Sequence, residues 1–411
     1  MIRAPPSKSF MQRYVLLSSF LDGHISIHNP GFSDDDMVSM GIGQSCGKTI
    51  HQDIDRITLE GKFEKPKTLA VGESGTSFRL LHGLLASRRC KTEILCNPSL
   101  LRRPIDPLIS SLKPYGYNYS FYGNRVQVDA SDFSCPGNIR IDPSLSSQFL
   151  SSLMFCMALS REENGIIEVQ GKIASEGYVK ITQSVLEKFG VLSHMGKVIS
   201  IDSRDIHIPE DVEIEGDYSS AAFPIVMGLL LSDDGITVTG LPERTVQPDR
   251  EILEILKKYI KIEHYGDSIS VTSKKTEIGR ISLDVNKNPD LAPPVSILSL
   301  ISEEGVEIRN AERLRAKESD RLNGIMEILK SIGCQWEYSS GNLYIYRGKV
   351  NSSGEIPERA DHRMVMTKFI ASAFFKDRFQ IQNESSVSKS YPDFFRNVEE
   401  LGFKIENKEK L

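Results

Sequence analysis

The stretch Pro6-Ser7-Lys8-Ser9 opens an apolar helical run that carries Arg13 and continues to Leu21. A serine at this point is a good helix N-cap, and the free backbone N–H groups of a first turn attract anions, especially beside a lysine. Taken alone, the stretch indicates only a capped helix with a solvated lysine. The fold prediction rests on its recurrence along the chain.

Similar helix starts, with small or charged residues before an apolar run, recur at a spacing of about 70 residues, longer than the usual solenoid period. They are Ser7-Lys8-Ser9, Glu73-Ser74-Gly75-Thr76, Ser146-Ser147-Gln148, Asp217-Tyr218-Ser219-Ser220, Pro289-Asp290 and Asp361-His362-Arg363. Glycines typical of helix C-caps repeat at the same spacing. These are Gly47, Gly116, Gly190, Gly333 and Gly402. Alternating stretches at 117–128, 191–201, 260–271 and 334–346 then predict hairpins.

The repeated unit is therefore a strand, a helix, a strand, a second helix and a hairpin. Six copies divide into two groups of three, and each group predicts one α/β domain with sheets outside and helices inside, because the first helices are apolar nearly all round. If those helices begin on one side, their positive dipole ends converge on a cleft. We expect such a cleft to bind an anionic small molecule.

Composition excludes several classes of protein. A chain of 411 residues with 39% apolar content is too long for one ordinary core, so two domains are expected. A net charge of -5 provides no basic field for nucleic acid or a membrane surface. The six cysteines are scattered without a CxxC pair, which suits reduced thiols and indicates no metal site. With no signal segment and no apolar run of spanning length, we expect a cytoplasmic protein.

The ordered motifs resemble those of the 5-enolpyruvylshikimate-3-phosphate (EPSP) synthase family over essentially the whole chain. They are Ser7-Lys8-Ser9 with Arg13, Ser33-Asp34-Asp35, Ser74-Gly75-Thr76 with Arg79, Arg103-Pro104, Ser146-Ser147-Gln148, Ser175 with Tyr178, the run 215–220, Pro289-Asp290, the run 317–321, Asp361-His362-Arg363 and the run 389–393. The resemblance implies two inverse α/β barrels, each of three βαβαββ repeats. One domain would span 8–216, the other 1–7 plus 217–411, with crossover hinges near 7–8 and 216–217.

The resemblance also implies the reaction. The family transfers the enolpyruvyl group of phosphoenolpyruvate to the 5-hydroxyl of shikimate 3-phosphate by addition and then elimination of phosphate. The implied partners are these two small molecules, with no metal or organic cofactor, no nucleic acid and no membrane, and we expect a monomer. The family is the target of glyphosate, and Gly75 leaves the phosphoenolpyruvate subsite as open as in sensitive members.

Site residues follow from the same motif positions. The implied catalytic residues are Asp290 as base, Glu318 in proton transfer at the methylene carbon, and Lys8 between the two ligands. Shikimate 3-phosphate would be held by Lys8, Ser9, Arg13, Ser146, Ser147, Ser175, Tyr178, Asp290, Arg313 and Lys317. Phosphoenolpyruvate would be held by Lys8, Gly75, Arg103, Gln148, Arg321, Arg363 and Lys389.

Simpler interpretations exist for several of these residues. Asp290 would equally serve as the N-cap of a helix over 291–301, and Ser146-Ser147 as ordinary caps. The run 317–321 would by itself indicate a solvated helix start. Four positions also depart from the family pattern: Pro6 replaces a glycine, and Gln12, Glu73 and Arg313 replace asparagines. A carboxylate at Glu73 should repel a bound phosphate unless it is protonated, paired or turned away, so it puts phosphoenolpyruvate affinity and glyphosate sensitivity in doubt.

Two other functions would share parts of this pattern. The UDP-N-acetylglucosamine enolpyruvyl transferases share the sixfold fold but usually carry a loop cysteine shortly before the Arg-Pro step, and residues 97–102 contain none. A non-enzymatic anion-binding protein would be expected to have lost Asp290, Glu318 or Lys389, and all three are present.

Overall fold

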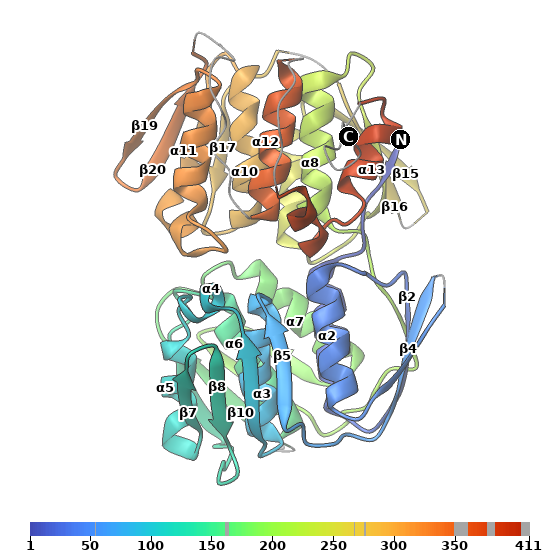
Figure 1. Cartoon of the computed structure of the whole chain (residues 1–411), viewed down its shortest axis with the longest axis vertical. Helices are drawn as coiled ribbons and strands as arrows, with labels where there is room; N and C mark the ends of the chain where they lie inside the picture. Colours follow the sequence, from blue (N-terminus) through green and yellow to red (C-terminus); the bar gives the residue numbers. More distant parts are fainter. Residues whose placement is uncertain are drawn as a thin grey trace. The chain divides into compact units, whose positions relative to one another are not determined.

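A computed structural model of the chain describes residues 1–53, 55–160, 164–266, 268–274, 277–348, 361–375 and 383–403. The chain divides into two compact units, drawn in Figure 1. The N-terminal unit is Pro6–Ile214, and the C-terminal unit is Met1–Pro5 with Glu215–Leu411. Each unit has its own cluster of buried apolar side chains. The expected crossover points lie beside these boundaries.

The N-terminal unit contains three copies of the predicted repeat. The first copy consists of α1 (Lys8–Ser19), β2 (Gly23–His28), α2 (Asp34–Ser45), β3 (Thr49–Gln52) and β4 (Arg56–Gly61). The second consists of β5 (Thr68–Gly72), α3 (Gly75–Ser87), β6 (Lys91–Cys96), α4 (Pro98–Leu101), α5 (Asp106–Leu112), η1 (Lys113–Tyr115), β7 (Asn118–Tyr122) and β8 (Arg125–Asp129). The third consists of β9 (Asn138–Ile141), α6 (Ser147–Leu159), β10 (Gly165–Val169), α7 (Gly177–Lys188), β11 (Leu192–His194) and β12 (Val198–Asp202), and β13 (Asp211–Glu213) follows it.

The C-terminal unit repeats the pattern. Its first copy consists of β1 (Ile2–Arg3), α8 (Tyr218–Leu231), β14 (Thr237–Pro242), η2 (Pro248–Arg250), α9 (Glu251–Leu256), β15 (Ile260–Tyr265) and β16 (Ser268–Ser273). The second consists of β17 (Ile281–Asp284), η3 (Pro289–Leu291), α10 (Ala292–Ile297), η4 (Leu298–Leu300), β18 (Val306–Arg309), η5 (Ala311–Ala316), α11 (Arg321–Ser331), β19 (Gln335–Ser339) and β20 (Asn342–Tyr346). The third shows α12 (His362–Phe374), η6 (Glu384–Lys389) and α13 (Phe394–Glu400), and its expected strands lie outside the described residues.

The described strands form sheets with one shared topology. The orders are β13-β2-β4-β3, β5-β6-β8-β7, β9-β10-β12-β11, β1-β14-β16-β15 and β17-β18-β20-β19. In each sheet the first two strands are parallel and the hairpin adds two antiparallel strands, as in the pairings Leu69 with Ile94 and Ile94 with Val126. The N-terminal strand β1 pairs with β14, Ile2 lying opposite Val238. The predicted hairpins are thus confirmed.

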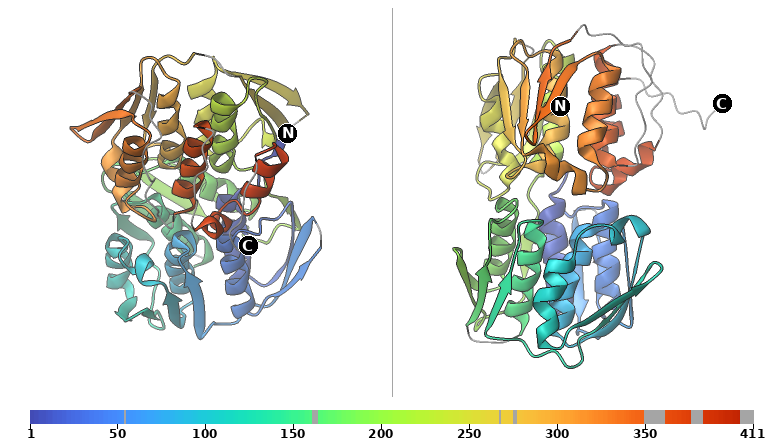
Figure 2. Two further views of the ribbon diagram at one scale, coloured as in Figure 1. Left: turned by 45° about the horizontal axis from the view of Figure 1, so that its top comes forward. Right: turned by 90° about the vertical axis from the view of Figure 1, so that its left-hand side faces the viewer.

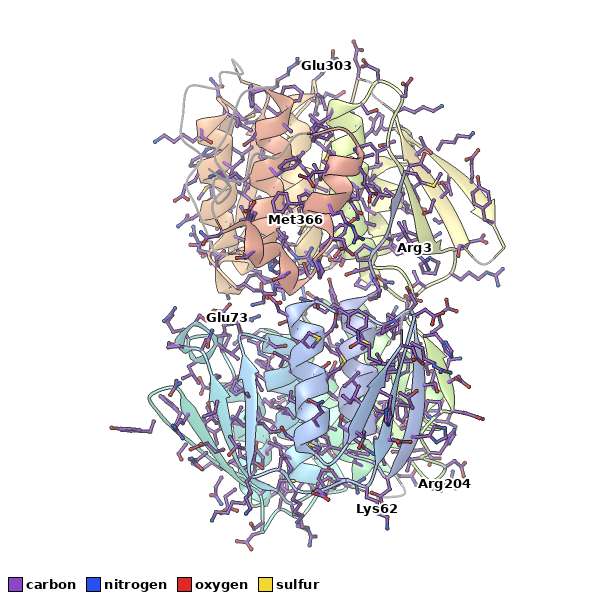
Figure 3. All side chains as sticks on the ribbon, turned by 45° about the vertical axis from the view of Figure 1, so that its right-hand side comes forward. Arg3, Lys62, Glu73, Arg204, Glu303 and Met366 are labelled. Carbon is purple, nitrogen blue, oxygen red and sulfur yellow. The ribbon has the colours of Figure 1, made fainter. Side chains whose placement is uncertain are left out.

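The first helix of each copy lies inside its unit, as predicted. In α6 every residue except Gln148 is buried, and α8 is buried from Tyr218 to Leu230. Helices α8, α10, α11 and α12 pack side by side in the C-terminal unit (Figure 1). Figure 2 shows from two further directions that the sheets of the N-terminal unit flank its helices. Met366 of α12, labelled in Figure 3, is fully buried.

Local signals account for most helix ends. Ser7, Ser74, Ser146, Asp217 and Asp361 are the N-caps of the buried helices that follow them. The predicted cap glycines all have left-handed backbone, with φ from 75° at Gly333 to 92° at Gly116. The fifth copy differs from the prediction. Asp290 lies inside η3, and the expected helix over 291–301 consists of a short α10 over 292–297 with 3₁₀ turns on both sides, η3 before it and η4 after it. Pro293 and Pro294 lack an N–H group, so they cannot donate the hydrogen bonds that would extend the α-helix back over η3.

Within the described residues, no helix is both long enough and apolar enough to cross a bilayer.

Candidate active site

The side chain of Arg321, at the start of α11, is 1% exposed and lies among three carboxylates. Its Nη1 donates to Asp290 Oδ1 at 2.7 Å, its Nη2 lies 2.7 Å from Glu318 Oε2, and its Nε donates to Asp361 Oδ2 at 2.9 Å. Asp320 caps the helix by accepting from Asn323 N at 3.0 Å. The interpretation of 317–321 as a solvated helix start is therefore wrong for Arg321.

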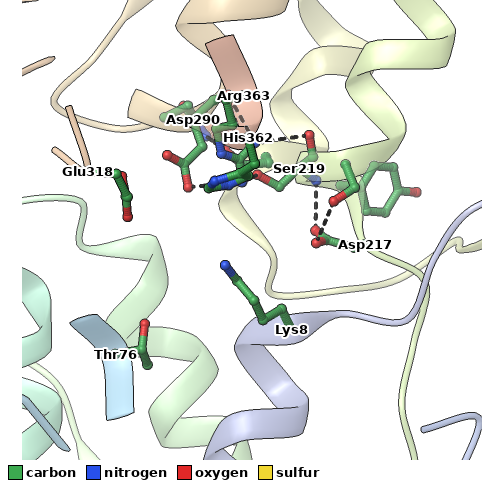
Figure 4. Close-up of polar contacts among 12 residues, drawn as sticks. Lys8, Thr76, Asp217, Ser219, Asp290, Glu318, His362 and Arg363 are labelled. Carbon is green, nitrogen blue, oxygen red and sulfur yellow. Dashed lines mark hydrogen bonds and ion pairs between the residues drawn. The ribbon is translucent and has the colours of Figure 1, made fainter. Parts of the chain in front are cut away.

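Arg363, in the first turn of α12, lies between Asp290 and Ser219 (Figure 4). Its Nη2 is 3.3 Å from Asp290 Oδ2 and donates to Ser219 Oγ at 2.8 Å. Asp361 caps α12 by accepting from Arg363 N at 3.0 Å, and Asp217 caps α8 by accepting from Ser219 N at 2.9 Å. The starts of α8, α11 and α12 thus hold two guanidiniums around the carboxylate of Asp290.

In this cluster the charged side chains lie close to side chains of opposite charge, which shift the pKa values of Asp290 and Lys317 toward the charged form. Burial would raise the pKa of Asp290, but Arg363, Arg321 and Lys317 hold it well below the ordinary value. Burial lowers the pKa of Lys317 to about 8, although Asp290 and Glu318 oppose the shift. The side chains of Asp290 and Glu318 remain 22% and 23% exposed. The interpretation of Asp290 as a helix N-cap is wrong, because Asp290 lies inside η3 and Leu291 is the residue that caps α10.

Other predicted ligands of the C-terminal unit lie on neighbouring 3₁₀ segments. Arg313, in η5, donates to Asn286 O at 3.3 Å and to Asn286 Oδ1 at 3.1 Å. Lys389 ends η6, which packs against α12. Lys317 directly precedes Glu318 and lies close enough to Asp290 for the two charges to interact.

In the N-terminal unit, Lys8 and Arg13 lie five residues apart on α1 and differ in surroundings. Lys8 Nζ pairs with Asp35 Oδ2 at 2.8 Å, and its side chain is 17% exposed. Arg13 is 2% exposed, and it donates from Nε to Thr182 Oγ1 at 2.8 Å and from Nη1 to Ser9 O at 2.8 Å. Its Nη2 reaches Tyr178 O at 3.4 Å. Arg13 therefore links α1 to the first turns of α7 by hydrogen bonds.

The predicted serines of this unit occupy helix starts. Ser146 caps α6 and accepts from Gln148 N at 3.3 Å, so its capping role is confirmed. Ser147 is the first residue of α6 and is 6% exposed. Ser175 precedes α7 with a left-handed φ of 50°, and the half-buried Tyr178 packs on the core beside it.

Gly75 and Arg103 are in direct contact, and Gln148 meets the same helix start. A Cβ added at Gly75 would lie 2.3 Å from Arg103 Nη1, so the guanidinium rests against the Gly75 backbone. Gln148 Nε2 donates to Thr76 Oγ1 at 2.9 Å, and its Oε1 accepts from Arg79 Nη1 at 2.7 Å. The structure thus brings together three of the seven predicted phosphoenolpyruvate residues, with Arg103 and Gln148 both meeting the start of α3.

Sequence reasoning gave no role to several residues that the structure places in these clusters. Asp35, Thr76, Arg79, Ser219 and Asp361 all contact predicted site residues. Each of them belongs to a motif quoted for the family, so the motifs themselves pointed to these positions. Their role could not be derived because their partners lie far away in sequence.

Three of the departures from the family pattern have a structural account. Glu73, labelled in Figure 3, is exposed and accepts from Ser99 Oγ at 3.0 Å, so its carboxylate is solvated and hydrogen-bonded. Gln12 is fully buried and donates to Asp35 O at 2.9 Å and to Ser74 Oγ at 3.0 Å, which joins α1 to the starts of α2 and α3. Arg313 is anchored on Asn286, as described above. Nothing in the structure explains Pro6 in place of a glycine.

These clusters suit anion chemistry. Guanidiniums and helix N-termini bind phosphate and carboxylate groups, and a solvent-accessible carboxylate beside them can accept a proton from a hydroxyl. In the part of the chain that the structure describes, no group of three or more His, Cys, Asp or Glu side chains is arranged to hold a metal ion.

Known proteins match the chain over nearly its whole length. Residues 1–398 match the sequence model of the family described as EPSP synthase (3-phosphoshikimate 1-carboxyvinyltransferase). The 3-phosphoshikimate 1-carboxyvinyltransferase of Picrophilus torridus is 38% identical over 409 residues, which cover 98% of this chain and 96% of the relative. The protein of the same name from Thermoplasma acidophilum is 35% identical over 398 residues, with coverages of 97% and 94%.

Solved structures agree on the fold. An EPSP synthase from Acinetobacter baumannii superposes with a TM-score of 0.78 at 21% identity, covering 98% of this chain and 96% of that one. The enolpyruvyl transferase NikO from Streptomyces tendae gives a TM-score of 0.76 at 16% identity, with coverages of 98% and 95%. The predicted α/β fold of the enolpyruvyl transferases is therefore confirmed, and the chain belongs to the EPSP synthase family.

Proposed function

We propose that this chain transfers the carboxyvinyl group of phosphoenolpyruvate to the 5-hydroxyl of shikimate 3-phosphate and releases phosphate. The observation that carries the proposal is the placement of Asp290 between Arg321 and Arg363, at 2.7 Å and 3.3 Å. Two guanidiniums can hold the anionic groups of the donor, and the carboxylate between them can receive the hydroxyl proton. Membership of the EPSP synthase family supports this assignment.

The first half of the proposed reaction is an addition. The 5-hydroxyl oxygen bonds to the carbon of phosphoenolpyruvate that carries the phosphate, while Asp290 takes the hydroxyl proton. A proton from Glu318 adds to the methylene carbon, which becomes a methyl group. The product of this half is a tetrahedral intermediate that still carries the phosphate.

The second half is an elimination. A proton leaves the methyl group for Glu318, the bond between carbon and phosphate oxygen breaks, and the double bond forms again. Phosphate departs and takes up the proton that Asp290 received, which restores the carboxylate, and the carboxyvinyl group stays on the acceptor oxygen. Lys8, Arg103 and Lys389 would hold the anionic groups as their charge shifts, with the cationic side chains acting in a partly desolvated site.

Asp290 and the donor compete for the same guanidiniums. Arg321 and Arg363 pair with Asp290 and hold its pKa low, which makes it a weak base. When the anionic groups of the donor engage these arginines, part of their charge is neutralised. The carboxylate then regains basicity as the acceptor hydroxyl arrives.

The remaining ligand assignments also belong to the proposal. Shikimate 3-phosphate is assigned to Ser9, Arg13, Ser146, Ser147, Ser175, Tyr178, Arg313 and Lys317, and phosphoenolpyruvate to Gly75, Gln148, Arg321 and Arg363. We further propose a cytoplasmic monomer whose crossover segments at 7–8 and 216–217 act as hinges. Light scattering should give the mass of one chain, 46.0 kDa.

The test is phosphate release from phosphoenolpyruvate with different acceptors. Purified protein should release phosphate with shikimate 3-phosphate and not with UDP-N-acetylglucosamine. Asp290→Asn should lower kcat by roughly 10²- to 10⁴-fold, the range for a lost general base, and the control Asp211→Asn, at an exposed side chain, should not. Release with UDP-N-acetylglucosamine alone, or with neither acceptor, would contradict the proposal.

A further inference from the structure

Arg79 is a buried arginine on the second turn of α3 with no place in the proposed reaction. Its side chain is nearly inaccessible, at 5% residue exposure. The guanidinium lies 5.5 Å from the centre of the Phe149 ring, donates from Nη1 to Gln148 Oε1 at 2.7 Å, and donates from Nη2 to Pro104 O at 3.0 Å. Both acceptors adjoin or belong to the proposed phosphoenolpyruvate residues.

The contact with Gln148 determines which way its amide faces. A guanidinium has donors and no acceptor, so only the amide oxygen can face Arg79. The amide nitrogen must then face the opposite way, and it donates to Thr76 Oγ1 at 2.9 Å. An amide nitrogen carries two hydrogens, and this contact uses one of them. Arg79 therefore fixes the orientation of the Gln148 amide so that its nitrogen, a hydrogen-bond donor, faces the start of α3.

The contact with Pro104 acts on a second residue of the same subsite. Pro104 directly follows Arg103, whose guanidinium rests against Gly75. A hydrogen bond to the Pro104 carbonyl holds the backbone from which Arg103 extends. The buried Arg79 side chain thus holds two hydrogen-bonding residues of the subsite, Gln148 and Arg103, which are distant from each other in sequence.

We propose that Arg79 is a positioning residue for the enolpyruvyl donor, acting through the Gln148 amide and the Arg103-Pro104 backbone. The ligand class is a small molecule that bears phosphate and carboxylate groups, and this step rests on the function proposed above. Arg79 does not bond to the donor. Without Arg79, the Gln148 amide and the Arg103 guanidinium are still present but no longer point at phosphoenolpyruvate. A misplacement of about 1 Å can cost 10²-fold in rate.

The test compares Arg79 with Arg88, the C-cap residue of the same helix. Arg88, at the opposite end of α3, lies 5.7 Å over the Phe63 ring and donates to Phe20 O at 2.9 Å, so it has the same kinds of contact without Gln148. Lysine at either position keeps the charge, but a single ammonium cannot reproduce the planar fork that reaches two oxygens. The variants are therefore Arg79→Lys and Arg88→Lys.

Arg79→Lys should raise the KM for phosphoenolpyruvate roughly 10- to 100-fold, with the KM for shikimate 3-phosphate changed less than about twofold. Arg88→Lys should leave both KM values within about twofold. Equal rises in both KM values for Arg79→Lys, or the same rise for both variants, would overturn the proposal, because a merely structural role predicts no such selectivity.

A double-mutant cycle tests the route through Gln148. If Arg79 acts through this amide, Arg79→Lys should raise the KM for phosphoenolpyruvate less in a Gln148→Ala background than in the wild type. A double variant whose KM rise equals the product of the two single rises would contradict that route. Thermal unfolding of all variants separates these effects from lost stability.

A readout that needs no turnover separates this inference from the proposed function. The side-chain amide resonance of Gln148 in ¹⁵N-labelled protein, assigned by its absence in Gln148→Ala, should shift in Arg79→Lys and stay unchanged in Arg88→Lys. An unchanged resonance in Arg79→Lys would overturn the positioning role even if the enzyme is active. A shifted resonance in a protein without transferase activity would instead reject the proposed function alone.

Discussion

Arg321 Nε and Asp361 Oδ2 lie 2.9 Å apart, and both side chains are 1% exposed. Asp361 also caps α12, so this ion pair joins the start of α11 to the start of α12. Burial would raise the pKa of Asp361, but Arg321 and His362 keep it below the ordinary value. The pair therefore remains charged at neutral pH, and it fixes the guanidinium that faces Asp290.

Removing one partner of this buried pair should be costly. Arg321→Met leaves Asp361 buried without its main counter-charge, and breaking such pairs costs about 3 to 5 kcal/mol. We expect urea unfolding to show a fall of this size in the free energy of unfolding. Arg309→Met, at the exposed end of β18, should change it by less than about 0.5 kcal/mol. A similar small change for both variants would mean that the pair contributes little to stability.

The crossing of α3 and α6 predicts a second stability effect. A Cβ at Gly83 would lie 1.9 Å from Ser152 O, and the Gly83 N–H donates to Ser152 Oγ at 2.9 Å. Gly83→Ala should therefore force the helices apart and destabilise the fold by at least about 2 kcal/mol. Gly41→Ala, in α2 with open space around the added methyl, should be neutral or stabilising. Equal melting temperatures for the two variants would argue against a close helix crossing.

Acceptor binding should weaken at alkaline pH. The pKa of Lys317 is lowered to about 8 by burial, with Asp290, Glu318, Arg321 and Arg313 also near it. Its charge is present below that pH and is lost above it, so the affinity for shikimate 3-phosphate should fall as pH rises past about 8. Calorimetric titration at several pH values measures this fall.

Lys317→Arg provides the test of that assignment, since a guanidinium stays charged throughout the range. In this variant the affinity should remain level above pH of about 8. Lys330→Arg, at an exposed position of α11, should keep the wild-type profile. A Lys317→Arg profile that falls like the wild type would show that another group causes the pH dependence.

Gly75 offers a test of the donor subsite. The methyl of Gly75→Ala would lie 2.3 Å from Arg103 Nη1, and the flexible end of that side chain can move aside. We therefore expect a KM for phosphoenolpyruvate raised roughly 10-fold with little change in melting temperature. Gly137→Ala, where an added methyl meets nothing within 4 Å, is the matched control. An unchanged KM in Gly75→Ala would remove Arg103 from the subsite.

The sequence predicted what depends on local chemistry. Helix caps such as Ser146 and Asp361 and turn glycines such as Gly116 act within a few residues, so their recurrence revealed the repeat. The repeat implied a hairpin after α2, but the bounds of β3 and β4 were not predicted, because the turn between them contains no glycine. The expected helix over 291–301 has 3₁₀ turns at both ends of α10, which an apolar run alone does not indicate.

The contacts inside the candidate site could not be predicted in the same way. Arg321 meets Asp361 across 40 residues of sequence, and Arg79 meets Gln148 across 69. Such pairs depend on how whole helices pack, which no local pattern encodes. Resemblance to the family supplied candidate residues, but it did not show that Asp290 is paired with two arginines or that Arg13 braces α1 against α7.

The most direct test of the account is a turnover in D₂O followed by ¹H NMR. Protonation of the methylene carbon makes a methyl group, so elimination should leave deuterium on the vinyl carbon of the product. Glu318→Gln should slow both product formation and this incorporation by roughly 10²-fold or more, as expected for a lost proton donor. A wild-type product without deuterium on that carbon would contradict addition and elimination at this site, and unchanged rates in Glu318→Gln would remove Glu318 from the chemistry.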